Sequence, residues 1–116
     1  MCNINVTQNK KGDILYIMNE EIFCGMVNFK NMELEYYIIP RHISPINCGL
    51  ESYGIRVVKT EREEGGGAVV ESKEIDNVFY RKCDAEKFIN LIKRNCVTPM
   101  TLMDVVEDYI VDYFLA

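Results

Sequence analysis

The chain has 116 residues, of which 48% are apolar and 27% are charged, and its formal net charge is −5 at pH 7. This length and composition are those of one ordinary globular domain, which excludes a wholly disordered chain and two independent cores. The acidic balance repels phosphate backbones, so it disfavours nucleic acid as a partner.

In the first 32 residues we predict at most one hairpin, in addition to the strands that follow it. We expect residues 1–12 to form a poorly ordered arm, and residues 13–18 and 21–29 are candidates for two additional strands. The start of the chain lacks the basic and apolar segments of a signal peptide. No apolar stretch approaches the roughly 20 residues needed to span a bilayer, so we expect no membrane partner.

Three strands are predicted in the middle of the chain. Residues 33–39 (ELEYYII), 52–60 (SYGIRVVKT) and 68–74 (AVVESKE) are rich in the β-branched and aromatic side chains that favour strands. The segment 41–51 is interpreted as a loop because it holds proline, asparagine and glycine, and 61–67 as a mobile hairpin tip. The simplest arrangement is an antiparallel meander of three strands, or five with the N-terminal hairpin.

A first amphipathic helix is predicted over residues 85–95. Asp84 is the expected N-cap, because its carboxylate can accept hydrogen bonds from the free N–H groups of the first turn. At about 100° per residue, one side of this helix is apolar. That side holds Ala85, Phe88, Ile89, Leu91, Ile92 and Cys96.

A second helix follows Val97, and two starts are open for it. Either Thr98 caps it with Pro99 as the first helical residue, or Thr101 caps it with Asp104 three positions later. Its apolar arc consists of Leu102, Val105, Val106, Tyr109, Ile110, Tyr113 and Phe114. The predicted fold class is therefore α+β: a small antiparallel sheet of three to five strands, followed by two C-terminal helices packed on one face. We expect a single domain over residues 1–116, with 33–116 as its core.

No residue pattern predicts catalysis, a metal or a cofactor. The glycine triplet 65–67 lacks the rest of a phosphate loop, and glutamates surround it. His42 is the only histidine, which excludes a multi-histidine zinc site. A Cys48 nucleophile with His42 as its base is weighed against two ordinary loop residues, and the ordinary interpretation is favoured. The five cysteines show no disulfide or CxxC spacing, so we expect reduced thiols and a cytoplasmic location.

Two charged segments are candidate interaction surfaces. The second helix carries Asp104, Glu107, Asp108 and Asp112 opposite its apolar arc, either as a solvated face or as a docking surface. A basic segment, 81–94, includes Lys87, Lys93 and Arg94. It could pair with the acidic helix or contact nucleic acid. The aromatic end of the second helix, with Tyr113 and Phe114, suggests a homodimer or partner contact through the C-terminal helices.

Residues 53–59 (YGIRVVK) and 97–108 (VTPMTLMDVVED) resemble a small protein family of unknown function from Clostridia-like Gram-positive bacteria. The resemblance covers roughly residues 33–112, and its motifs are structural in character rather than catalytic. It implies a bacterial cytoplasmic setting and no known activity, and it carries over no active-site residues.

The sequence thus favours a non-enzymatic protein-interaction or regulatory module. Two alternatives stay open. One is a small-molecule binder or enzyme with an unrecognised pocket, near His42, Cys48 or the tyrosines. The other is a nucleic-acid-associated regulator that uses the basic segment 81–94.

Overall fold

A computed structural model describes the backbone of residues 16–18, 21–43 and 50–115, and the side chains of 21–41 and 51–112. The predicted arm, residues 1–12, lies outside these residues. So do Cys48 and the side chain of His42. No helix in the described part is both long and apolar enough to cross a membrane.

The described residues form a sheet of five antiparallel strands, which confirms the predicted α+β class. Their order is β1-β3-β4-β5, and β2 also pairs with β3. Because β1 and β2 pair with different parts of β3, they follow one another along the same edge of that strand. The bounds are β1 Tyr16–Met18, β2 Ile22–Phe29, β3 Met32–Ile43, β4 Leu50–Arg62 and β5 Ala68–Phe79.

The N-terminal strands pair with β3, so the predicted hairpin between residues 13–18 and 21–29 is wrong. The hairpin in this region is β2–β3, which turns at Lys30 with φ 58°. The predicted strand 33–39 also continues through Pro40. Proline is tolerated there because it falls between the last residue paired with β2 and the first paired with β1, where a missing N–H costs no ladder bond.

Helix α1, Lys82–Arg94, begins three residues earlier than predicted, with Arg81 at the N-cap position. Asp84 is therefore not the cap. It lies in the first turn, where its carboxylate suits the positive end of the helix dipole and sits 3.7 Å from the Arg81 side chain. The chain leaves α1 through Cys96 at φ 52°, while the Val97 N–H donates to the Ile92 carbonyl. This reversal turns Cys96 outward, so its predicted place on the apolar side is wrong.

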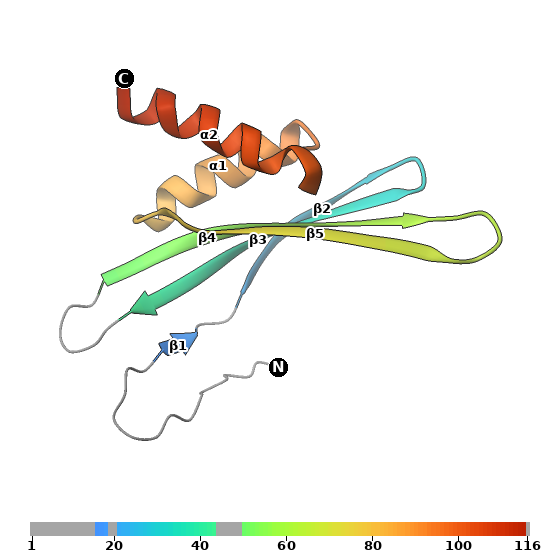
Figure 1. The fold of residues 1–116 in the computed structure, drawn as a ribbon, viewed down its shortest axis with the longest axis horizontal. Coiled ribbons are helices and arrows are strands. Elements are labelled where there is room, and N and C mark those ends of the chain that lie inside the picture. Colours follow the sequence, from blue (N-terminus) through green and yellow to red (C-terminus); the bar gives the residue numbers. More distant parts are fainter. Residues whose placement is uncertain (1–15, 19–20, 44–49, 116) are drawn as a thin grey trace.

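Helix α2, Pro99–Leu115, begins at Pro99, which confirms the first of the two predicted starts. Both helices lie on the same face of the sheet (Figure 1). The core between them and the sheet is built from alternate residues of β3 and β4, from the last residue of β5, from the predicted apolar sides of the helices and from the connection between the helices. It consists of Leu34, Tyr36, Ile38, Ile55, Val57, Phe79, Ala85, Phe88, Ile89, Ile92, Val97, Leu102 and Val106.

Two local contacts fix the helices on the sheet. The buried Tyr36 hydroxyl donates to the carbonyl of Val97 at 2.9 Å, which ties the central strand β3 to the connection between the helices. The ring of Tyr109 lies 4.9 Å from that of Phe88, which is itself 5.5 Å from Phe79. Aromatic contacts at these separations add about 0.5–1.5 kcal/mol each beyond their buried area.

One glycine is required by close backbone approach. Gly54 lies on β4 where the pairing with β5 is irregular, and a Cβ at this position would stand 2.6 Å from the carbonyl oxygen of Ile75. Real Cβ atoms do not approach an oxygen this closely, so any side chain here would push β4 and β5 apart.

Candidate interaction surface

Strand β5 is the last strand of the sheet, and no described strand pairs with its outer edge. At the hairpin tip the Glu63 N–H donates to the Gly67 carbonyl at 2.8 Å. Antiparallel ladders alternate hydrogen-bonded and non-hydrogen-bonded pairs, so residues 69, 71 and 73 direct their backbone groups toward β4. The N–H and C=O groups of Ala68, Val70, Ser72 and Glu74 then face outward. We call this row of outward-facing backbone groups, on alternate residues from 68 to 74, the β5 edge.

Two hollows lie along the β5 edge on the helix-covered face, and together we call them the groove. Its first part has a volume of about 380 Å³, and its second, further along both elements, about 330 Å³. Strand β5 forms one wall and helix α2 forms the other. The first part is lined by Glu71, Ser72, Lys73, Pro99, Met100 and Met103, and the second by Ile75, Asp76, Asn77, Val78, Tyr80, Val106 and Ile110.

Large apolar side chains line this groove yet remain in contact with water. Met100 is 77% exposed and Tyr80 is 68% exposed, and Met103 is also exposed. Methionine side chains are unbranched and adaptable, which suits them to surfaces that repack around a partner. The β5 edge and this groove together offer both backbone hydrogen bonds and apolar contact area to one ligand.

The acidic residues predicted as an interaction surface lie on the solvent side of α2. Asp104, Glu107, Asp108 and Asp112 are all exposed. Among the described residues, none of the ion pairs joins them to the basic segment 81–94. The supposed pairing between the acidic and basic helices is therefore not seen there.

The predicted basic residues do not form one surface. Lys87 and Arg94 are exposed, whereas Lys93 is half-buried and its Nζ donates to the Cys24 carbonyl at 3.0 Å, at a bulge in β2. Lys93 thus connects α1 to the edge strand β2. Tyr113 and Phe114, the aromatic residues predicted to make a partner contact, belong to helix α2. Their side chains lie outside the described part.

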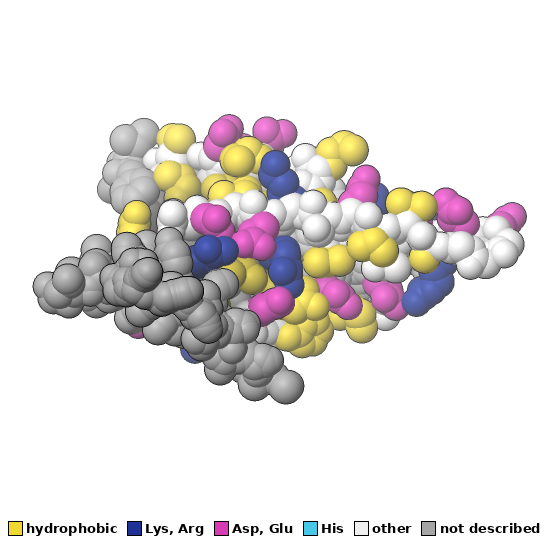
Figure 2. Space-filling view, turned by 60° about the horizontal axis from the view of Figure 1, so that its bottom comes forward, with side chains coloured by type: hydrophobic (Ala, Val, Ile, Leu, Met, Phe, Trp, Pro, Cys, Tyr) yellow, Lys and Arg dark blue, Asp and Glu magenta, His cyan; other side chains and the backbone are white. Residues whose placement is uncertain are grey.

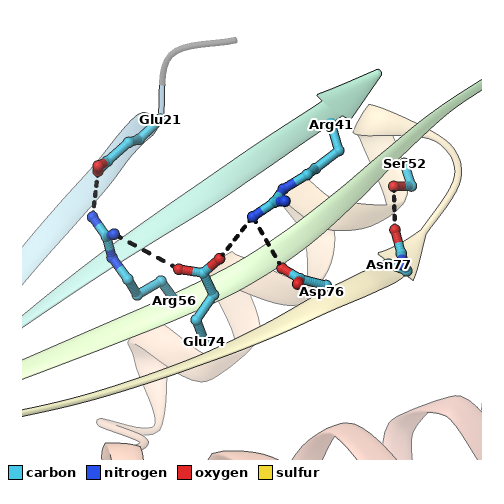
Figure 3. A network of polar contacts seen from close by, with 7 residues as sticks. All are labelled: Glu21, Arg41, Ser52, Arg56, Glu74, Asp76 and Asn77. Carbon is cyan, nitrogen blue, oxygen red and sulfur yellow. Dashed lines mark hydrogen bonds and ion pairs between the residues drawn. The ribbon is translucent and has the colours of Figure 1, made fainter. Parts of the chain in front are cut away.

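The helix-free face of the sheet carries a polar network that sequence reasoning missed (Figure 3). Glu74 on β5 accepts from Arg41 at 3.2 Å and lies 3.8 Å from Arg56. Arg41 also pairs with Asp76 at 3.5 Å, and Arg56 with Glu21. The register that places Arg56 opposite Glu74 is the signal that could have found this network.

The network is best explained as a clamp across the sheet. The two arginines form ion pairs with three carboxylates, which lie on β5 or just before β2. The positive charge of this network is therefore fully compensated, and none remains to bind an anionic ligand. The Arg56 guanidinium also stacks 4.7 Å above the ring centre of Tyr37, which contacts Phe23. Figure 2 shows charges of both signs interspersed with apolar side chains on this face.

The pKa shifts found in the described part are upward shifts of one thiol and of three tyrosines. Burial raises the pKa of the Cys24 thiol, which keeps it protonated and unreactive. Burial and the hydrogen bond to the Glu35 carboxylate raise the pKa of Tyr37. No three His, Cys, Asp or Glu side chains among the described residues lie close enough to hold a metal ion.

Comparison with known proteins identifies a family without an assigned activity. The family model described as "Family of unknown function (DUF6514)" matches residues 16–112, so the chain belongs to this family. The match begins upstream of the span predicted from resemblance, and it includes β1 and β2. Searches of curated proteins and of solved structures gave no match.

Proposed function

Because its family has no assigned activity, we propose from the surface itself that the protein is a non-enzymatic protein-interaction or regulatory module. Its binding site is the β5 edge together with the groove beside α2. One observation carries this proposal: a long edge strand with unpaired backbone groups runs alongside exposed apolar side chains of a helix.

An extended partner segment suits both parts of this site. An added strand would hydrogen-bond to the outward N–H and C=O groups of Val70, Ser72 and Glu74, which supplies affinity regardless of sequence. Every second side chain of that strand would point into the groove, toward Met100 and Met103. The partner segment should therefore alternate apolar residues, facing α2, with polar residues on the opposite face.

The test uses proline to block the edge without damaging the sheet. The Ser72 N–H faces outward, so Ser72→Pro removes a docking hydrogen bond while every bond to β4 remains. Ser72→Thr is the matched control, because it changes the side chain and keeps the N–H. Each form is used to capture proteins from the source cells, and each captured partner is then purified and its affinity measured.

We expect a partner, which includes a second copy of this chain, to bind wild type and Ser72→Thr equally and to bind Ser72→Pro roughly tenfold or more weakly. Equal affinity of the partner for all three forms would show that the binding site is not the β5 edge. Failure of wild type to bind any protein, itself included, would overturn the interaction module.

The setting is proposed on separate grounds. We place the protein in the cytoplasm of a Clostridia-like Gram-positive bacterium. Support comes from the sequence resemblance and from three described cysteines, Cys24, Cys83 and Cys96, that are all free. Free cysteines are typical of a reducing compartment.

A further inference from the structure

We propose that the strand occupying the β5 edge belongs to a second copy of this chain, paired antiparallel about a two-fold axis at Ser72. This inference rests on the proposed function and names its partner. With a two-fold axis perpendicular to the sheet, the two sheets would join into one continuous sheet, and the helices of both copies would lie on the same face. Pairing would also remove an exposed edge of each copy.

The charges on β5 select the register. With Ser72 on the axis, Glu71 of each copy stands opposite Lys73 of the other, which gives two reciprocal ion pairs on the helix-covered face. On the same face, Val69 stands opposite Ile75. The outward backbone groups of Ser72 then form a hydrogen-bonded pair with those of its counterpart.

Neighbouring registers are less favourable because most of them bring like charges together. An axis at Glu71 opposes two glutamates, and an axis at Lys73 opposes two lysines. An axis at Glu74 again opposes two carboxylates. An axis at Val70 avoids repulsion, but it places Glu71 of one copy opposite Val69 of the other, so no ion pair forms. The register at Ser72 is thus the one that pairs opposite charges across the interface.

Two exposed methionines of α2 line the groove at the same place. The part of the groove beside Glu71, Ser72 and Lys73 is walled by Met100 and Met103. An axis at Ser72 therefore brings these methionines toward those of the second copy, above the paired strands. Exposed apolar area at the centre of an interface, with ion pairs beside it, is the usual arrangement of a dimer contact.

A charge-swap experiment tests the register directly. Two single variants, Lys73→Glu and Glu71→Lys, each replace the ion pairs with repulsive pairs in a homodimer. Mixed together, they restore both pairs, because the Glu71→Lys copy carries lysine at both positions and the Lys73→Glu copy carries glutamate at both. Sedimentation velocity over a concentration series measures the dissociation constant of each sample, and circular dichroism verifies that each variant folds.

We expect wild type to dimerise, each single variant to dimerise roughly tenfold or more weakly, and the equimolar mixture to recover wild-type affinity. If a single variant does not fold by itself, a second measurement, hydrogen exchange on the wild type, tests the inference instead. That measurement should show the Val70, Ser72 and Glu74 amides becoming protected as concentration rises.

Two results would overturn this inference. One is a wild type that stays monomeric at all concentrations. The other is a dimer that the single variants form as tightly as wild type. Neither refutes the interaction module if a different protein still binds wild type and Ser72→Thr but not Ser72→Pro. Equal binding by Ser72→Pro would refute both.

Discussion

The hydrogen bond from Tyr36 to Val97 should be measurable as a pH-dependent contribution to stability. The Tyr36 side chain is fully buried, and its hydroxyl donates to the Val97 carbonyl. Tyr36→Phe removes this bond and leaves a buried carbonyl without its partner. We expect the free energy of unfolding to fall by about 1–3 kcal/mol at neutral pH.

The pH dependence follows from the direction of the pKa shift. Burial raises the pKa of Tyr36 well above its ordinary value of about 10. A raised pKa in the folded state means that the stabilisation is complete below about pH 10 and declines above it, because only the unfolded chain ionises there. At about pH 11 the wild type should have lost between about 1 and 2 kcal/mol through this residue alone.

The assay is urea denaturation of wild type and Tyr36→Phe, followed by circular dichroism at about pH 8 and about pH 11. Comparing the two proteins cancels the titration of all other tyrosines. The difference between their free energies of unfolding should shrink by between about 1 and 2 kcal/mol at the higher pH. If the difference between the two free energies of unfolding stays constant with pH, Tyr36 is not buried in its neutral form. If that difference is zero at the lower pH, the hydrogen bond does not contribute to stability.

Three further changes test the fold by the same denaturation assay. Gly54→Ala should destabilise the protein by at least about 2 kcal/mol, because its Cβ would collide with the backbone of β5; an unchanged stability would contradict the close approach at this bulge. Phe88→Ala should cost about 3–5 kcal/mol, since Phe88 is fully buried between two aromatic rings, and a cost below about 1 kcal/mol would count against that packing. Replacing Asp104 and Asp108 with asparagine should change stability by less than about 0.5 kcal/mol, as both are exposed; a larger loss would reveal a contact that the structure lacks.

The helices could be predicted because their signal is local. An apolar residue every three or four positions fixes which side of a helix is buried, and Phe88 and Leu102 are buried as expected. The error at Asp84 arose because a good capping residue is equally suited to the first turn, where the dipole also favours it. Local chemistry therefore predicts the helix but not its first residue.

Strand pairing could not be predicted in the same way because it is not local. The sequence around residues 13–29 fits a hairpin, yet both strands pair with β3, which offers an edge long enough for the two in succession. The candidate site depends on the same kind of information. Which strand ends the sheet, and which helix lies beside it, are facts of topology that neither β5 nor α2 encodes alone.

The lengths of the elements explain why the candidate interaction surface lies at β5. Strands of 12 and 13 residues extend roughly 40 Å, whereas helices of 13 and 17 residues extend roughly 20–26 Å. The helices therefore cannot cover the whole sheet, and the β4–β5 hairpin projects beyond them (Figure 1).

Beside the first turns of α2, where the helix cover ends, the face that continues the core is largely charged. Lys59 on β4 lies 3.2 Å from Glu71, directly opposite on β5, and Lys73 follows on the same face. Charges on an exposed edge oppose non-specific pairing of strands, and at β5 they would distinguish one register from another in the dimer that we propose. The charged positions of β5 beside the first turns of α2 are thus the ones that would specify a partner strand.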